Sequence, residues 1–166
     1  MKTLSDVYKL AEEYEEMCER IGIDVGEISN YKINSRAKKR WGQCSKNPNG
    51  TFTIEISNLL LQDDVKDMAL ENTLMHEILH TVDGCFNHGA KWKMCADMVN
   101  NAYGFNVKRC TSSQEKGIVI ERPATHYVLR CKKCGYKWNY SRMSKTVKHP
   151  ENYKHNDCGG TLERWI

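Results

Sequence analysis

The sequence contains no run of about 18 apolar residues, the length that a helix needs to cross a membrane. Its first 17 residues carry charges throughout, and they lack the apolar core and the cleavage site of a secretory signal. Internal repeats and low-complexity tracts are also absent. These absences argue against membrane and secreted proteins, so we expect a cytoplasmic protein with no membrane partner.

Disulfides are rare in such a reducing compartment, so the eight cysteines need another explanation. Clustered cysteines of intracellular proteins commonly bind metal. Cys131, Cys134 and Cys158 fall in a metal-binding spacing. The other five are scattered and are expected to be buried free thiols: Cys18, Cys44, Cys85, Cys95 and Cys110.

The net charge of +4 is unevenly distributed along the chain. Residues 111–166 contain eleven Lys and Arg against five Asp and Glu, a net charge of +6, so residues 1–110 carry −2. A polyanionic partner such as DNA would be sought on this basic segment. A solvated basic face without any partner is the simpler explanation of the same charge.

Apolar residues recur at helical spacing in three segments, and they alternate in one. The predicted helices cover residues 3–21, from 63 or 64 to about 83, and from about 89 to 103. Gly84 and Gly104 are their stop signals. Thr51–Ile56 alternates as a half-buried strand does, and residues 28–45 are strand-rich.

The composition changes after residue 110. The polar stretch 111–117 resembles a linker, and short strands follow it. We therefore predict an α+β domain at residues 1–110, with helices packed on a small sheet, and a small β domain at residues 118–166.

The motif His76-Glu77-Ile78-Leu79-His80 lies inside the second predicted helix. Residues i and i+4 share one helical face, so both imidazoles can point at one cation. Glu77 lies about 100° further round, where it can reach a metal-bound water without ligating the metal. Zinc lowers the pKa of that water towards about 7, and the carboxylate can accept its proton during attack on a carbonyl. The pattern predicts a catalytic zinc with Glu77 as general base.

Three kinds of residue compete for the third ligand position. A glutamate on a later helix is one solution, but none occurs between Ile78 and Gln114. Asp83 is at i+7 from His76, and it can ligate only if the helix breaks before it. His88 lies beyond Gly84, where the chain can turn back towards the helix. We therefore predict His88 as the ligand, with Asp83 orienting an imidazole.

Two knuckle-like sequences, Cys131-Lys-Lys-Cys134-Gly and His155-Asn-Asp-Cys158-Gly, occur near the C-terminus. Their spacing is typical of a zinc ribbon. Four N and S ligands form a closed tetrahedral site, which is structural rather than catalytic. His149 is an alternative to His155, but His155 repeats the two-residue spacing. The chain should therefore bind two Zn²⁺, one catalytic and one structural.

Basic and aromatic residues surround these ligands, a combination that grips phosphates and stacks bases. The candidate contacts to substrate or to single-stranded DNA are Lys132, Lys133, Lys137, Trp138 and Tyr140. The same residues can instead cover the metal cage and keep a small domain soluble.

The order of these features resembles the SprT-like family of zincin metallopeptidases, which runs from bacterial SprT to the eukaryotic DNA–protein crosslink protease Spartan. The matching stretches are Arg40-Trp41-Gly42, Ile54–Leu60, His76-Glu77-x-x-His80, His88-Gly89-x-x-Trp92-Lys93 and the two C-terminal knuckles. The segment Arg40–Cys44 is also similar to YgjP-like metallopeptidases, which match the ribbon less well. His155 departs from the cysteine that is commoner in the family's ribbon.

The resemblance implies a zincin-like α+β fold followed by a zinc ribbon. It also implies zinc on His76, His80 and His88, with Glu77 as the base of an endopeptidase. Proteins or peptides are the expected substrates, DNA-associated proteins among them, and residues 51–56 are the expected edge strand for an extended substrate. The alternative is a zinc-stabilised nucleic-acid-binding or regulatory module with vestigial catalysis, although such a module would not need Glu77.

Overall fold

The computed structural model describes residues 1–37, 40–118 and 126–165. The chain forms two compact units, Met1–Ile120 and Glu121–Ile166. Residues 119–125, at the start of the predicted second domain, lie outside the described residues, as do 38–39 and 166. No helix in the described part of the chain is both long and apolar enough to cross a membrane.

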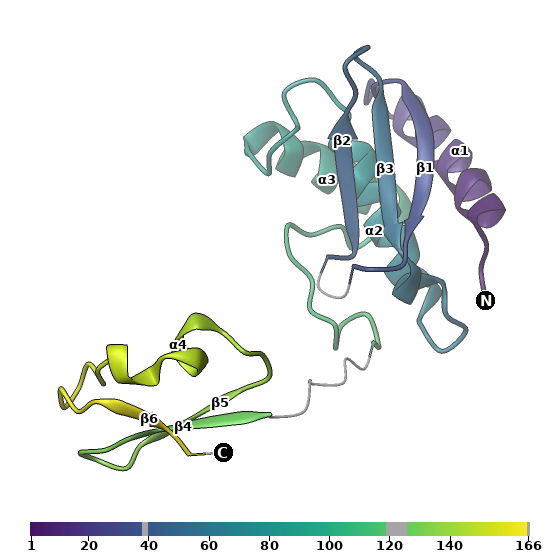
Figure 1. Cartoon of the computed structure of the whole chain (residues 1–166). Helices are drawn as coiled ribbons and strands as arrows, with labels where there is room; N and C mark the ends of the chain where they lie inside the picture. The colour runs from purple at the N-terminus through teal and green to yellow at the C-terminus, as the bar shows by residue number, and fades with distance from the viewer. Residues whose placement is uncertain (38–39, 119–125, 166) are drawn as a thin grey trace. The chain divides into compact units, whose positions relative to one another are not determined.

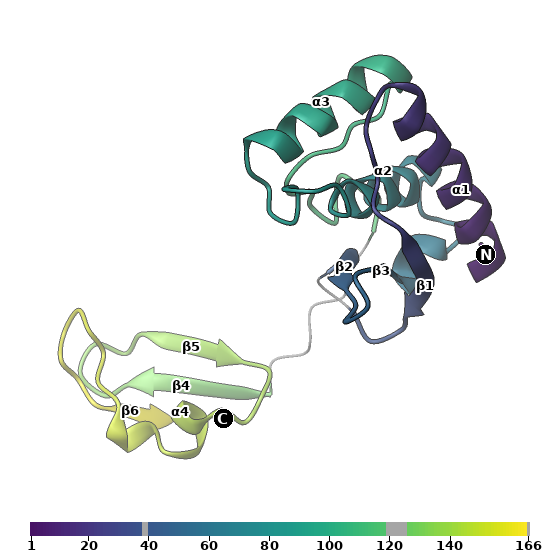
Figure 2. The ribbon, with the colours of Figure 1, turned by 90° about the horizontal axis from the view of Figure 1, so that it is seen from above.

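The first unit contains a three-stranded sheet with helices on one side (Figures 1 and 2). Its elements are α1 (Leu4–Arg20), β1 (Ile28–Asn34), β2 (Gly42–Lys46), β3 (Phe52–Ser57), the 3₁₀ helix η1 (Asn58–Leu61), α2 (Asp67–Leu79) and α3 (Ala90–Tyr103). The helix α1 packs against β1 and α2, and α2 also packs against β2, β3 and α3. The α+β prediction is confirmed for this unit.

The strand β3 occupies the centre of the sheet, whose order is β1-β3-β2. It pairs in parallel with β1 and antiparallel with β2, so strands flank it on both sides. The prediction that residues 51–56 form an edge strand was therefore wrong. Alternation identifies a half-buried strand but not its neighbours. Of the three strands, β1 and β2 are the edges.

The helix α2 is shorter at both ends than the sequence predicts. Lys66 precedes its first turn without a side-chain cap. Residues 58–61 form the separate 3₁₀ helix η1. At the other end, α2 finishes at Leu79, and His80 is its C-cap residue. Thr81 then donates its hydroxyl to the Ile78 carbonyl, and Gly84 has a φ of 73°, so the chain reverses. This early end lets the following loop fold back over the face of α2 that carries His76 and His80.

The core of the first unit is built from one face of each helix and from β3. The helix α2 buries Leu70, Leu74 and Ile78, and β3 buries Ile54 and Ile56. Each such side chain contributes about 1.5–3 kcal/mol when it is buried fully. The motif that carries His76 and His80 therefore lies on a helix anchored by its opposite face.

The five scattered cysteines divide into three classes. Cys18, Cys85 and Cys95 are buried, as predicted, and Cys44 is partly buried. Cys110 is exposed, so its prediction was wrong, because it lies in an irregular polar segment beyond α3.

The second unit is a small antiparallel sheet with the strand order β5-β4-β6 (Figure 1). Its elements are β4 (Tyr127–Cys131), β5 (Lys137–Tyr140), α4 (Lys145–Lys148), the 3₁₀ helix η2 (Pro150–Asn152) and β6 (Leu162–Arg164). Its buried cluster consists of only Leu129, Cys131, Val147 and Leu162 among the described residues. A core of this size does not stabilise a domain alone. This favours a bound metal as the additional source of stability.

Candidate metal centres and active site

Three histidine side chains converge at the C-terminal end of α2. His76 and His80 come from α2, and His88 comes from the loop before α3. Their Nε2 atoms are separated by 3.3 Å (His76–His80), 3.1 Å (His80–His88) and 2.9 Å (His76–His88). Nitrogens bound to a tetrahedral zinc at about 2.0–2.1 Å lie about 3.3–3.4 Å apart. The three atoms therefore fit the ligand positions around one such ion.

The opposite ring nitrogens set the tautomers of two histidines. Nδ1–H of His76 donates to the Lys108 carbonyl over 2.9 Å, and Nδ1–H of His80 donates to the Cys85 carbonyl over 2.8 Å. A carbonyl can only accept, so the proton resides on Nδ1 and each Nε2 keeps a free lone pair. These backbone groups also fix the ring orientations, as partners of metal ligands commonly do.

The environment keeps the three imidazoles neutral. Burial, together with the neighbouring His80 and His88, lowers the pKa of His76 to about 3. Burial likewise lowers the pKa of His80 and the pKa of His88. Neutral imidazoles are the form that ligates metal. The site therefore needs no deprotonation of these histidines at neutral pH.

Trp92 of α3 forms the floor beneath the three imidazoles. It is 1% exposed, and its ring centroid lies 4.7 Å from that of His76, 5.5 Å from that of His80 and 4.6 Å from that of His88. A large rigid side chain against all three rings restricts their rotation. Trp92 thus supports the convergence of the Nε2 atoms.

Asp83 and His88 differ in their relation to this cluster. His76, His80 and His88 form a candidate metal-binding group that does not include Asp83, which is exposed. The early end of α2 explains this difference, because it allows residue 88 to return to the helix face.

Glu77 lies next to the cluster without joining it. Its side chain is buried, with 7% of the residue exposed, and it is not part of the metal-binding group. Burial raises the pKa of Glu77 to about 7, although the Cys44 backbone N–H, Arg40 and Lys116 act in the opposite direction. A carboxylate with a pKa near neutrality can both accept and return a proton.

Gly42 of β2 leaves the space that the Glu77 side chain occupies. A Cβ at residue 42 would lie 2.6 Å from both Cγ and Oε1 of Glu77. Gly42 is not among the glycines with positive φ, so its backbone conformation does not require glycine. Residue 42 must be glycine because the Glu77 carboxylate approaches its backbone closely.

Lys116 is a second charged residue buried beside Glu77. It is 4% exposed, and its Nζ donates to Thr73 Oγ1 over 2.6 Å and to the Ala69 carbonyl over 3.4 Å. Nζ also lies 6.0 Å from the Trp41 ring centroid. Burial lowers the pKa of Lys116 to about 8.

The segment 111–117, predicted as a linker, thus contributes to the first unit, where Lys116 and Ile118 are buried. Gly42, the Cys44 N–H and Lys116 were all missed as parts of the site. Gly42 lies in a stretch that the sequence singled out, but Lys116 lies among polar residues without any periodicity.

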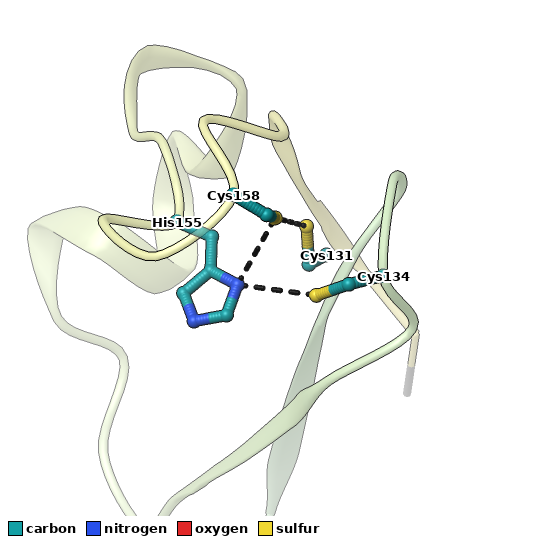
Figure 3. Close-up of side chains that lie close together, drawn as sticks. All are labelled: Cys131, Cys134, His155 and Cys158. Atoms are coloured by element: carbon teal, nitrogen blue, oxygen red, sulfur yellow. Dashed lines mark hydrogen bonds between the residues drawn. The ribbon is translucent and has the colours of Figure 1, made fainter.

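A second candidate metal-binding group lies in the second unit (Figure 3). Cys131 Sγ lies 3.4 Å from Cys158 Sγ, and His155 Nδ1 lies 3.1 Å from Cys134 Sγ and 3.3 Å from Cys158 Sγ. His155 Nε2 is 3.2 Å from Asp157 Oδ2, a carboxylate that orients the ring. Three cysteines and one histidine form a donor set suited to a closed zinc site.

The surroundings of Cys131 favour its deprotonated form. Burial opposes ionisation of Cys131, but the backbone N–H groups of Cys134 and Lys133 lower its pKa to about 6. His149 lies outside the group, with Nδ1 3.4 Å from Glu151 Oε1. The structure therefore brings His155, and not His149, to the three sulfurs.

The five residues predicted to contact nucleic acid do not share one surface. Successive residues of a strand point to opposite faces, and Lys137 lies over Trp165 with its Nζ 5.0 Å from the ring centroid. Trp138 packs against His155 instead, with ring centroids 4.9 Å apart. Tyr140 packs with Trp138 against the buried cluster, whereas Lys133 donates to the Cys158 carbonyl over 2.9 Å. Lys132 is exposed.

Comparison with known proteins places the chain in a family. The SprT-like family model matches residues 7–111, which include the three histidines, Glu77, Gly42 and Trp92. No curated protein and no solved structure gives a significant match. The family match covers more than half of the 166 residues. The chain therefore belongs to the SprT-like family.

Proposed function

We propose that this chain is a zinc-dependent metallopeptidase with a zincin-like active site, and that a second zinc stabilises its C-terminal ribbon. One observation carries the proposal: three neutral imidazoles converge on one point, and the buried carboxylate of Glu77 lies beside them without joining the ligand group. A purely structural site would not require that carboxylate.

His76, His80 and His88 would hold the catalytic ion. Bound there, zinc would supply a Lewis acid that polarises a carbonyl and lowers the pKa of water to about 7. Glu77 would accept a proton at its carboxylate and pass it to the leaving amine. The Cys44 N–H donates to this carboxylate, and Gly42 leaves room for it. These two backbone features fix the direction of the proton acceptor.

The edge strand β2 is the best candidate for substrate pairing. It lies at the border of the sheet, and it carries Gly42 and Cys44 next to Glu77. An extended peptide that adds to this edge would receive main-chain hydrogen bonds and would run past the carboxylate.

Metal removal tests the proposal directly. Zinc-loaded protein should hydrolyse casein or its own chain, a strong chelator should abolish hydrolysis, and added zinc should restore it. Peptide fragments separated by mass spectrometry provide the measurement. Hydrolysis that persists after chelation, or its absence from protein with a full metal content, would contradict the peptidase proposal.

A second candidate activity, nucleic-acid binding, is favoured by one face of the ribbon sheet. The Arg130 guanidinium carbon lies 3.7 Å from the centroid of Trp165, and Lys137 Nζ lies on the same ring. Trp165 remains 46% exposed. Arg130 is paired with Glu163, so the exposed indole and Lys137 are the groups available to stack a base and bind a phosphate.

We expect Lys137→Gln to weaken binding of single-stranded DNA and to reduce the salt dependence of log K by about one phosphate contact. Lys9→Gln is the matched control, because it removes the same charge from an exposed position on α1. Fluorescence anisotropy over a series of salt concentrations measures both variants. If the full chain does not bind DNA at low salt, the ribbon lysines are a solvated face.

A further inference from the structure

A cavity of about 290 Å³ lies beside His76 and Glu77. Four of its lining residues are basic: Arg40, Lys108, Arg109 and Lys116. Glu77 is its only acidic lining residue among the described residues. Residues 1–110, which supply three of these four basic residues, have a net charge of −2. Positive charge is therefore concentrated at this cavity, although residues 1–110 as a whole have a net negative charge.

The buried cation Lys116 has only neutral hydrogen-bond partners. Its Nζ donates to Thr73 Oγ1 and to the Ala69 carbonyl, while the more distant carboxylates of Glu115 and Glu77 partly offset the effect of burial on the pKa of Lys116. A buried lysine is rare unless it is paired. Two of the three N–H donors of the ammonium group are used in these bonds, so one donor remains for a carboxylate from outside the chain.

Two neutral polar side chains of the cavity, Thr73 and Asn72, are already engaged within the protein. Thr73 donates its hydroxyl to the Ala69 carbonyl over 2.7 Å while it accepts from Lys116. Asn72 donates to the Met68 carbonyl over 2.7 Å and accepts from the Asn106 N–H over 2.6 Å. The four basic side chains are therefore the strongest groups that the cavity offers to a negatively charged ligand.

We propose that this cavity is a specificity pocket for the carboxylate of an aspartate or glutamate side chain adjacent to the cleaved peptide bond. The inference rests on the peptidase function proposed above. The volume is just below the range of about 300–1,000 Å³ found for pockets that hold drug-sized ligands, and it suits a single side chain. Because Glu77 and His76 form part of the wall, an occupant of the cavity would lie next to the reacting carbonyl.

Paired peptides test the preference. We would use fluorogenic peptides with amidated C-termini that differ only in Glu, Gln or Lys at one position beside the cleaved bond. The zinc-loaded wild type should cleave the Glu peptide with a kcat/KM at least about tenfold above that of the Gln peptide, with the Lys peptide slowest. Lys116→Met should reduce the Glu-to-Gln ratio towards one, whereas the matched surface variant Lys9→Met should retain it.

Arg109→Gln guards against misfolding of Lys116→Met, because residue 109 is exposed. It should lower kcat/KM for the Glu peptide more than kcat/KM for the Gln peptide, so that the Glu-to-Gln ratio falls. Equal cleavage of all three peptides, or a preference that appears only when the free C-terminal carboxylate occupies this position, would overturn the pocket assignment and leave the peptidase function standing.

A binding assay separates failure of the pocket from failure of catalysis. Labelled Glu and Gln peptides are titrated against the wild type and against Lys116→Met at low and high salt. Tighter binding of the Glu peptide to the wild type alone, weakened by salt, supports the pocket even if no peptide is cleaved. Equal binding of both peptides by the wild type would refute the pocket, whatever the catalytic result.

Discussion

Glu77→Gln is expected to reduce kcat/KM for peptide hydrolysis by at least about 10²-fold, the lower end of the range for loss of a general base. Glutamine has the shape of glutamate, so it fits the space left by Gly42 and can still accept from the Cys44 N–H. It cannot accept a proton at neutral pH. The metal content should stay unchanged, since Glu77 lies outside the ligand group.

The experiment combines steady-state kinetics on a peptide substrate with metal analysis and circular dichroism. Glu71→Gln is a suitable control, because residue 71 is a glutamate on the same helix outside both metal-binding groups. Retention of full activity by Glu77→Gln would place the base elsewhere. Loss of metal from this variant would instead make Glu77 a ligand or a support of the ligands.

His88→Ala is expected to lower the metal content from two ions per chain to one, with loss of hydrolysis. Removal of one of three protein ligands leaves two, which is too few for a stable zinc site. Asp83→Ala should keep both ions, because Asp83 lies outside the histidine cluster. Metal analysis of protein purified without chelators measures both outcomes.

The two ions should also differ in how readily they leave. The histidine group has three ligands and an open position, whereas the ribbon group has four, so a mild chelator should remove the first ion before the second. A wild type that holds one ion or none would contradict the prediction of two zinc sites per chain. Full metal and activity in His88→Ala, together with their loss in Asp83→Ala, would reverse the choice of third ligand.

Features encoded by short spacings could be predicted from the sequence. The i, i+4 histidines required a helix, and α2 forms it, because the apolar residues of the same segment share a helical period. The two knuckles also come together as their spacing predicts. Whether His155 or His149 joins the cysteines depends on how the loop between the knuckles folds. The sequence favoured His155 only because it repeats the two-residue spacing of Cys131 and Cys134.

Features that depend on distant contacts could not be predicted in this way. The central place of β3 follows from its pairing with β1 and β2, which the alternation within one strand does not encode. Lys116 sits in a polar stretch, and only its contacts with Thr73 and Ala69 show that it is buried. The first compact unit therefore extends to Ile120, and includes the polar stretch that composition marks as a linker.

The space at Gly42 has a consequence for how this site is mapped by mutagenesis. Alanine scanning infers a role from what is lost when side-chain atoms are removed, and residue 42 has none to remove. Alanine is here an addition, whose single methyl group would overlap the Glu77 carboxylate. A conventional scan that skips glycines would miss residue 42, although the position of the Glu77 carboxylate depends on it.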